Sequence, residues 1–228
     1  MFLVLLPFVS MAQSKIGIPI HPADHFLFQL SSDRWLGAPD SIDSHRRGAS
    51  RGANLYVMLD RPFASNKHFS VAFGLGVGTS NIFFKNMTVD IAGKTPVLKF
   101  KDVENEVRYK KYKVTTAYLE APVELRFSSN PANPKKSIKM ALGAKAGILL
   151  NAHTKGKNLL DASGGKLNSS TDKVSNRSYF NSTRLSATAR VGYGNFSLFG
   201  SYGLGPVFKD GVSADMRLLQ VGITFSAL

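Results

Sequence analysis

The sequence predicts an all-β protein, an eight-stranded antiparallel up-and-down β-barrel that crosses a membrane. Two observations carry this prediction. Apolar and polar side chains alternate along one segment after another from Arg51 to Leu228, and the connections between these segments are alternately long and short. A strand of about 9–11 residues with every second side chain apolar is enough to cross a bilayer within a barrel. The pattern therefore indicates a location before it indicates an activity.

The first twelve residues have the composition of a secretory signal. Phe2–Val9 is an apolar run that is too short for a spanning helix, and the small residues Ser10 and Ala12 follow it. No break in composition divides the rest of the chain. We expect a signal peptide, or alternatively an apolar arm, over residues 1–12 and a single barrel domain over residues 13–228.

Eight segments carry the alternation, and an even number suits a closed antiparallel barrel. In the last segment Val221, Ile223 and Phe225 share one face, while Gln220 and Thr224 share the other. In chain order the predicted strands are His25–Ser32, Arg51–Asp60, His68–Gly78, Thr115–Ser128, Ser137–Asn151, Ser182–Tyr193, Asn195–Leu204 and Met216–Ala227.

Three consecutive predicted strands, the fourth to the sixth, carry charged side chains on one face. Charges on that face cannot meet lipid, so in a membrane barrel they point into the lumen. Eight strands enclose an interior just wide enough for side chains to fill, so we expect these charges to plug it. An ion- or proton-conducting path is the alternative. The predicted network is structural and consists of Glu120, Glu124, Arg126, Lys139, Lys145, Arg184 and Arg190.

The lengths of the connections separate a membrane barrel from a soluble one. Outer-membrane barrels have short periplasmic turns and longer outer loops. With the N-terminus in the periplasm, parity places every long connection outside, a regularity for which a soluble barrel gives no reason. The four predicted outer loops are Asp33–Ser50, Thr79–Val114, Ala152–Asn181 and Gly205–Asp215, and the three short turns are Arg61–Lys67, Ser129–Lys136 and the turn at Gly194.

Aromatic residues and a proline add local expectations. Trp35, Phe83, Phe84 and Tyr193 fall near predicted strand ends, where membrane barrels have aromatic belts at the lipid–water interface. Pro122 lies inside the fourth strand, where it cannot donate a ladder hydrogen bond. We therefore expect a bulge or a local kink at that proline.

An alternating series of glycines lies in the third predicted strand. Gly74, Gly76 and Gly78 have neither the spacing nor the following helix of a dinucleotide-binding loop. We expect them to face the lumen and to leave room for larger side chains from other strands, such as Tyr118 or Arg126.

The chain is strongly basic, with 29 Lys and Arg against 15 Asp and Glu and a net charge of +14. Such a balance can indicate a nucleic-acid partner. The densest basic stretch, Lys99–Lys113, is however interrupted by Asp102, Glu104 and Glu106 and lies in no nucleic-acid-binding pattern. We expect anionic lipid headgroups or a surface polysaccharide as the counter-charge, and no nucleic acid.

Three segments resemble the PorT-like outer-membrane β-barrel family. The stretch Tyr118–Phe127, with the proline in its middle, resembles the central strand of that family, and Phe69–Gly76 and Gln220–Phe225 are similar to it as well. The resemblance covers most of the mature chain. It implies an eight-stranded barrel in a Gram-negative outer membrane, and some relatives assist protein secretion and gliding whereas many have no assigned role.

The sequence predicts no catalytic site, no metal site and no cofactor. His21 and His25 are four residues apart, but the intervening proline opposes a helix and no third ligand is near. The local candidate for hydrolase chemistry is His45 with Asp43 and Ser44, and adjacent residues of one loop rarely form a triad.

The expected function is that of a non-enzymatic integral outer-membrane protein with a structural, surface-binding or secretion-associated role. Its expected partners are outer-membrane lipid and, at the loops, anionic lipopolysaccharide or a secretion-machinery protein. Two alternatives remain open at this point. One is a soluble or periplasmic barrel that binds a small ligand, and the other is an outer-membrane rim enzyme acting on lipid or peptide through His45 or His153.

Overall fold

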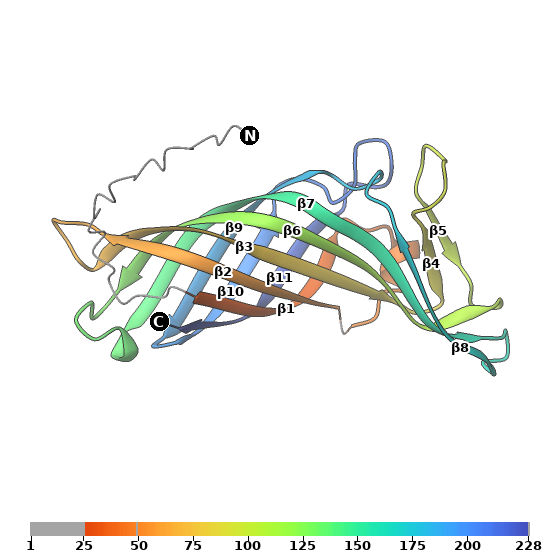
Figure 1. Ribbon diagram of the computed structural model, residues 1–228, viewed down its shortest axis with the longest axis horizontal. Coiled ribbons are helices and arrows are strands. Elements are labelled where there is room, and N and C mark those ends of the chain that lie inside the picture. The colour runs from red at the N-terminus through yellow and green to blue at the C-terminus, as the bar shows by residue number, and fades with distance from the viewer. Residues whose placement is uncertain (1–25, 49, 228) are drawn as a thin grey trace, which may run out of the picture.

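A closed barrel of eight antiparallel strands makes up most of the molecule (Figure 1). The structure, a computed structural model, describes residues 26–48 and 50–227; the predicted signal peptide and the His21–His25 pair lie outside them. Each strand pairs with its neighbours along the chain, and the first pairs with the last. The predicted fold class is confirmed. The strands are β1 (Phe26–Leu36), β2 (Arg51–Pro62), β3 (Phe69–Phe84), β6 (Arg108–Ser128), β7 (Ile138–Leu160), β9 (Thr183–Tyr193), β10 (Phe196–Gly203) and β11 (Arg217–Ala227).

The smaller elements lie in the connections. The strands β4 (Met87–Asp90) and β5 (Lys99–Asp102) form a hairpin, and β8 (Lys166–Ser175) pairs with the outer part of β7. These elements project together from one end of the barrel in Figure 1. The two helical segments in the described residues, α1 (Asp40–Asp43) and a 3-10 turn at Pro134–Lys136, are both too short to cross a membrane.

Four strands extend farther outward than the alternation predicted, so parts of the predicted outer loops are strand. The alternation fails there because the outward side chains become polar beyond the lipid, while the backbone ladder continues. β1 ends at Leu36 rather than Ser32, β3 ends at Phe84 rather than Gly78, β6 begins at Arg108 rather than Thr115, and β7 ends at Leu160 rather than Asn151.

All eight strands present exposed apolar side chains on their outward face, as a lipid-facing band requires. On β6, Leu119, Val123 and Leu125 are exposed, while Glu120 and Glu124 between them are buried. A continuous apolar surface of this extent is rare on soluble proteins and marks a membrane or partner contact. The polar face therefore lines the lumen and the apolar face meets lipid.

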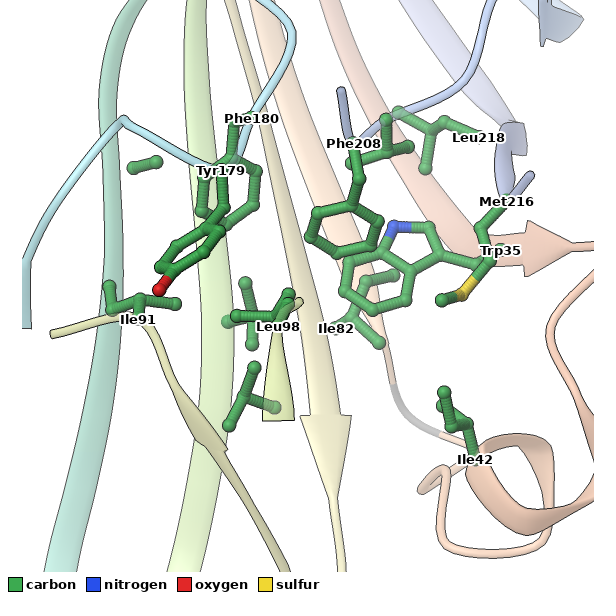
Figure 2. Close-up of a cluster of buried hydrophobic side chains, with 14 of the residues drawn as sticks. Trp35, Ile42, Ile82, Ile91, Leu98, Tyr179, Phe180, Phe208, Met216 and Leu218 are labelled. Atoms are coloured by element: carbon green, nitrogen blue, oxygen red, sulfur yellow. The ribbon is translucent and has the colours of Figure 1, made fainter. Parts of the chain in front are cut away.

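A hydrophobic core fills the outer end of the barrel (Figure 2). The Trp35 ring contacts the Phe208 ring edge-on at 5.2 Å between centroids, and Phe180 lies against Phe208 at 5.1 Å. Trp35 and Phe84 are buried in this core, so their predicted placement in an interfacial belt is wrong. Both face inward, and at the ends of their strands the inward direction leads beneath the outer loops rather than into lipid.

The bulge expected at Pro122 lies elsewhere. The register between β6 and β7 shifts between Ala117 and Tyr118, while Pro122 itself stays in register with Lys145. On its other side, the pairing of β3 with β6 is interrupted: Gly74 and Leu75 of β3 lie opposite Pro122 and Ala121 but are not paired with them. The proline thus interrupts one ladder, whereas the bulge lies nearer the outer end of the β6–β7 pair, where Leu150 of β7 is the extra residue.

Candidate functional site

A buried carboxylate organises the middle of the lumen. Glu120 on β6 has a relative exposure of 1%. It accepts a hydrogen bond from the Tyr56 hydroxyl at 2.5 Å, and its ion pairs are with Arg184 at 2.7 Å and Lys145 at 3.3 Å. Burying a charge is costly unless it is paired and hydrogen-bonded. These three contacts come from β2, β7 and β9, so one side chain ties distant parts of the barrel wall together.

Glycines make room for this carboxylate. In the strand register Glu120 lies between Gly76 on β3 and Gly147 on β7, and the next residue along that row is Arg184. A Cβ atom added at Gly78 would collide with the Glu120 carboxylate, and one at Gly76 would collide with Tyr56. Gly76 and Gly78 therefore accommodate Tyr56 and Glu120, and Gly74 lies against Met58, rather than against the Tyr118 and Arg126 side chains that the sequence suggested.

Replacing Gly78 by Ala is expected to destabilise the folded barrel by about 1–3 kcal/mol, because the new methyl group overpacks against Glu120. Urea unfolding in lipid vesicles measures this. Gly200→Ala is the matched control and should be neutral, since an added Cβ there meets nothing within 4 Å. Equal stability of the two variants would contradict the packing role of Gly78.

A second branch of hydrogen bonds crosses the lumen from the same centre. The Lys145 ammonium donates to Gln220 on β11 at 3.3 Å, and Gln220 donates to the Asp33 carboxylate on β1 at 3.2 Å. Ser31 donates to the same carboxylate at 2.5 Å. Polar side chains from opposite walls thus meet inside the barrel.

The predicted charges nearest the periplasmic end form a separate cluster. Glu124 accepts hydrogen bonds from Arg126 at 2.8 Å and from Arg190 at 3.0 Å. The Arg126 guanidinium also lies 3.9 Å from Asp60. Lys139 lines the adjoining cavity of about 620 Å³, which opens at the short-turn end, together with Arg126 and Arg190.

Sequence reasoning missed five residues of these clusters: Tyr56, Asp60, Ser31, Asp33 and Gln220 as a bonding partner. Tyr56 and Asp60 lie at even-numbered positions of β2, on the same face as the buried Asn54, so strict alternation could have found them. Asp33 was assigned to a loop because the predicted first strand ended at Ser32, whereas β1 continues to Leu36.

Little free space remains between the Glu120 cluster and the Glu124 cluster. The cavity lined by Tyr56, Glu124 and Lys145 measures about 20 Å³. A cavity of roughly 10–15 Å³ on this measure holds one water molecule. Beyond it, toward the outside, lies the hydrophobic core built around Trp35 and Phe208.

The rim histidines do not form the suggested catalytic arrangement. Asp43 pairs with Arg34 and Arg46, not with His45. Asp102, from the β4–β5 hairpin, lies 3.5 Å from His45 Nε2 instead.

On the other ring nitrogen, His45 Nδ1 lies 2.9 Å from the carbonyl oxygen of Ser41 and 3.2 Å from the Ser44 hydroxyl. A carbonyl can only accept, so Nδ1 carries the proton in that contact and is not placed to take one from Ser44. The other rim histidine, His153, forms a hydrogen bond between its Nδ1 and Asn151 Oδ1 at 2.7 Å.

The described residues contain no cluster of three or more His, Asp or Glu side chains arranged to hold a metal ion.

Comparison with known proteins identifies the architecture. A family model described as "Outer membrane protein beta-barrel domain" matches residues 12–209. Among solved structures, one similar chain is Ail, the attachment invasion locus protein of Yersinia pestis, with 13% sequence identity and a TM-score of 0.32 over 88% of this chain and 95% of that one. No curated protein matches.

Proposed function

This chain belongs to the outer-membrane protein β-barrel domain family and is an integral protein of the outer membrane, and from that premise we propose that it is a closed, non-enzymatic surface component. It acts through the outer extension of the barrel, which consists of the parts of β3, β6 and β7 beyond the lipid together with β8, rather than through the lumen. The observation that carries this proposal is the pairing of Glu120 with Tyr56, Lys145 and Arg184 across the barrel. Long side chains held in this way leave no wide path for a solute.

The core at the outer end supports the same reading. Phe180 and Phe208 are buried there beside Trp35. A lumen that is filled at mid-height and covered outside is suited to holding the outer loops in place. Such a barrel offers those loops to partners at the cell surface.

Purified protein reconstituted in a planar bilayer is expected to show no single-channel steps above the bare-membrane baseline. The physical reason is that the ion pairs occupy the lumen of a barrel only eight strands wide. Loss of the folded gel mobility on boiling serves as the control that the barrel has inserted and closed. Discrete conductance steps from heat-sensitive, folded protein would overturn the proposal.

The PorT-like resemblance favours a secretion-machinery protein as a second kind of partner. It rests on Tyr118–Phe127, Phe69–Gly76 and Gln220–Phe225. These segments lie in β6, β3 and β11, inside the barrel wall, so they support the architecture more than a docking surface. Cross-linking from the outer loops in whole cells, followed by identification of the captured proteins, tests for such a partner.

A further inference from the structure

A row of lysines crosses the outer extension of the barrel. Lys113 on β6 lies directly opposite Lys155 on β7, and Lys155 lies directly opposite Lys173 on β8. One step farther out, Lys111 lies opposite Lys157. Directly paired residues project from the same face of a sheet, and like charges in such pairs are destabilising. The arrangement therefore costs stability in the protein alone.

These lysines face outward, away from the hydrophobic core. Tyr112 and Val114, on either side of Lys113, are buried on the inner face. The acid closest along β8, Asp172, is in register with Gly156 on the opposite face and accepts a hydrogen bond from Tyr109 at 2.8 Å. It therefore does not lie in the lysine row.

The surface around the row is hollowed and lacks acids. A cavity of about 250 Å³ lies beside the row, and its lining consists of Lys111, Lys113, Lys155, Lys157, Phe83 and Tyr112. The Lys113 ammonium lies 5.7 Å from the centre of the Phe83 ring and donates a hydrogen bond to Asn81 at 2.5 Å. An aromatic ring beside a cluster of cations is suited to an amphipathic ligand with negative charge.

The electrostatics of the outer extension agree with this geometry. Burial, followed by the charges of Lys155, Lys157 and Arg51, holds the pKa of Lys113 below its ordinary value. Burial and then Lys173, Lys113 and Lys155 lower the pKa of His153 in the same way. Neighbouring cations at this surface thus disfavour the charged forms of Lys113 and His153.

The row lies just beyond the lipid headgroups and within reach of them. Leu150 is the outermost exposed apolar residue of β7, and Lys155 follows five residues later. At about 3.3 Å per residue and a strand tilt of 35–45°, Lys155 lies roughly 12 Å farther from the bilayer centre than Leu150. Each headgroup layer is roughly 5–8 Å thick, and flexible lysine side chains extend toward it.

We propose that the row of Lys113, Lys155 and Lys173, with Lys111 and Lys157 beside it, binds the phosphate groups of an anionic glycolipid in the outer leaflet. The lipid phosphates supply the negative charge that the paired lysines lack, and Phe83 contacts the apolar part of the headgroup region. This inference rests on the proposed function, because it names the lipid partner of the same outer extension.

The test compares the full-length protein in phosphatidylcholine nanodiscs that contain either bisphosphorylated lipid A or the same lipid without phosphates. The patch variant is Lys113→Gln/Lys155→Gln/Lys173→Gln. The matched control, Lys94→Gln/Lys99→Gln/Lys166→Gln, removes three exposed lysines from the β4–β5 hairpin region and the start of β8. Lipid retained by the protein and the melting temperature are measured.

The wild-type protein is expected to retain phosphorylated lipid A preferentially and to melt at a higher temperature with it. The patch variant should lose roughly one hundredfold in binding, from three lysines near an anionic surface, and the control variant should keep it. Without lipid phosphate the patch variant should be at least as stable as wild type, because like-charge contacts are removed. The patch variant would thus be less stable than wild type with phosphorylated lipid but at least as stable without it, which would not follow if the lysines had a merely structural role.

Equal retention of both lipids by the wild type, or equal losses in the two variants, would overturn the inference. Full stabilisation by inorganic phosphate alone would show a free-anion site rather than a lipid site. If the triple variant fails to fold, the single variant Lys155→Gln replaces it in the binding measurement. The pKa of His153, measured by NMR titration of the wild-type protein, should then rise when phosphorylated lipid is added. A protein that keeps its heat-dependent gel mobility and shows no conductance still satisfies the proposed function. A negative lipid-binding result with such a protein therefore contradicts this inference alone.

Discussion

Replacing Ile223 by Arg is expected to reduce the stability of the barrel in a bilayer by about 2–4 kcal/mol, the cost of an arginine on the lipid face near the midplane. Ile223 lies at the middle of β11 and is 54% exposed. Its partners in register are Leu30 and Leu198, which are also exposed and apolar. The new guanidinium would therefore be surrounded by lipid and apolar side chains.

Leu167→Arg is the matched control for this substitution. Leu167 is 56% exposed, close to the value for Ile223, but it lies on β8, which pairs with the outer part of β7. An arginine there meets water or headgroups, so little change is expected. Chemical unfolding in lipid vesicles and the folded fraction on unboiled gels measure both variants; similar losses would contradict the placement of the lipid band.

Replacing Glu120 by Gln is expected to lower the free energy of unfolding by about 3–5 kcal/mol. The substitution keeps the shape of the side chain and removes its charge. Lys145 and Arg184 are then left buried without the carboxylate that both of them contact. An exposed acid of the outer loops, changed as Glu104→Gln, should alter stability by much less.

A double-mutant cycle separates the lost ion pair from lost packing. Lys145→Met removes the ammonium and keeps much of the side-chain volume, so Glu120→Gln combined with Lys145→Met should cost less than the sum of the single changes. The unfolding free energies of the four proteins are measured in the same vesicles. Simple additivity would show that Glu120 and Lys145 do not stabilise each other.

The inner and outer faces of the barrel could be predicted from the sequence because strand geometry is local. Side chains alternate with a period of two, so Glu120 and Glu124 point one way and Leu119 and Leu125 the other without any knowledge of neighbouring strands. The same rule, applied from one end of β2 to the other, would have included Tyr56. The lengths of the connections then determined which end is outside.

Contacts between strands could not be predicted in this way. Which lysine lies opposite Lys113 depends on the register of β6 against β7, and a bulge at Ala117/Tyr118 changes that register in the middle of the pair. The approach of Asp102 to His45 likewise depends on how two outer loops fold against each other. Alternation along one strand carries no information about either.

The sequence by itself determined the number of strands, their inner and outer faces and the side of the membrane on which the long connections lie, because these follow from a local period and from chain order. Only the tertiary structure decided that β3, β6 and β7 extend beyond the lipid, that Trp35 and Phe84 are buried in an outer core, and that Lys113, Lys155 and Lys173 form one row. Beyond the bilayer the apolar alternation ends. Structure there depends on register and on packing between residues far apart in the chain, which no local pattern encodes.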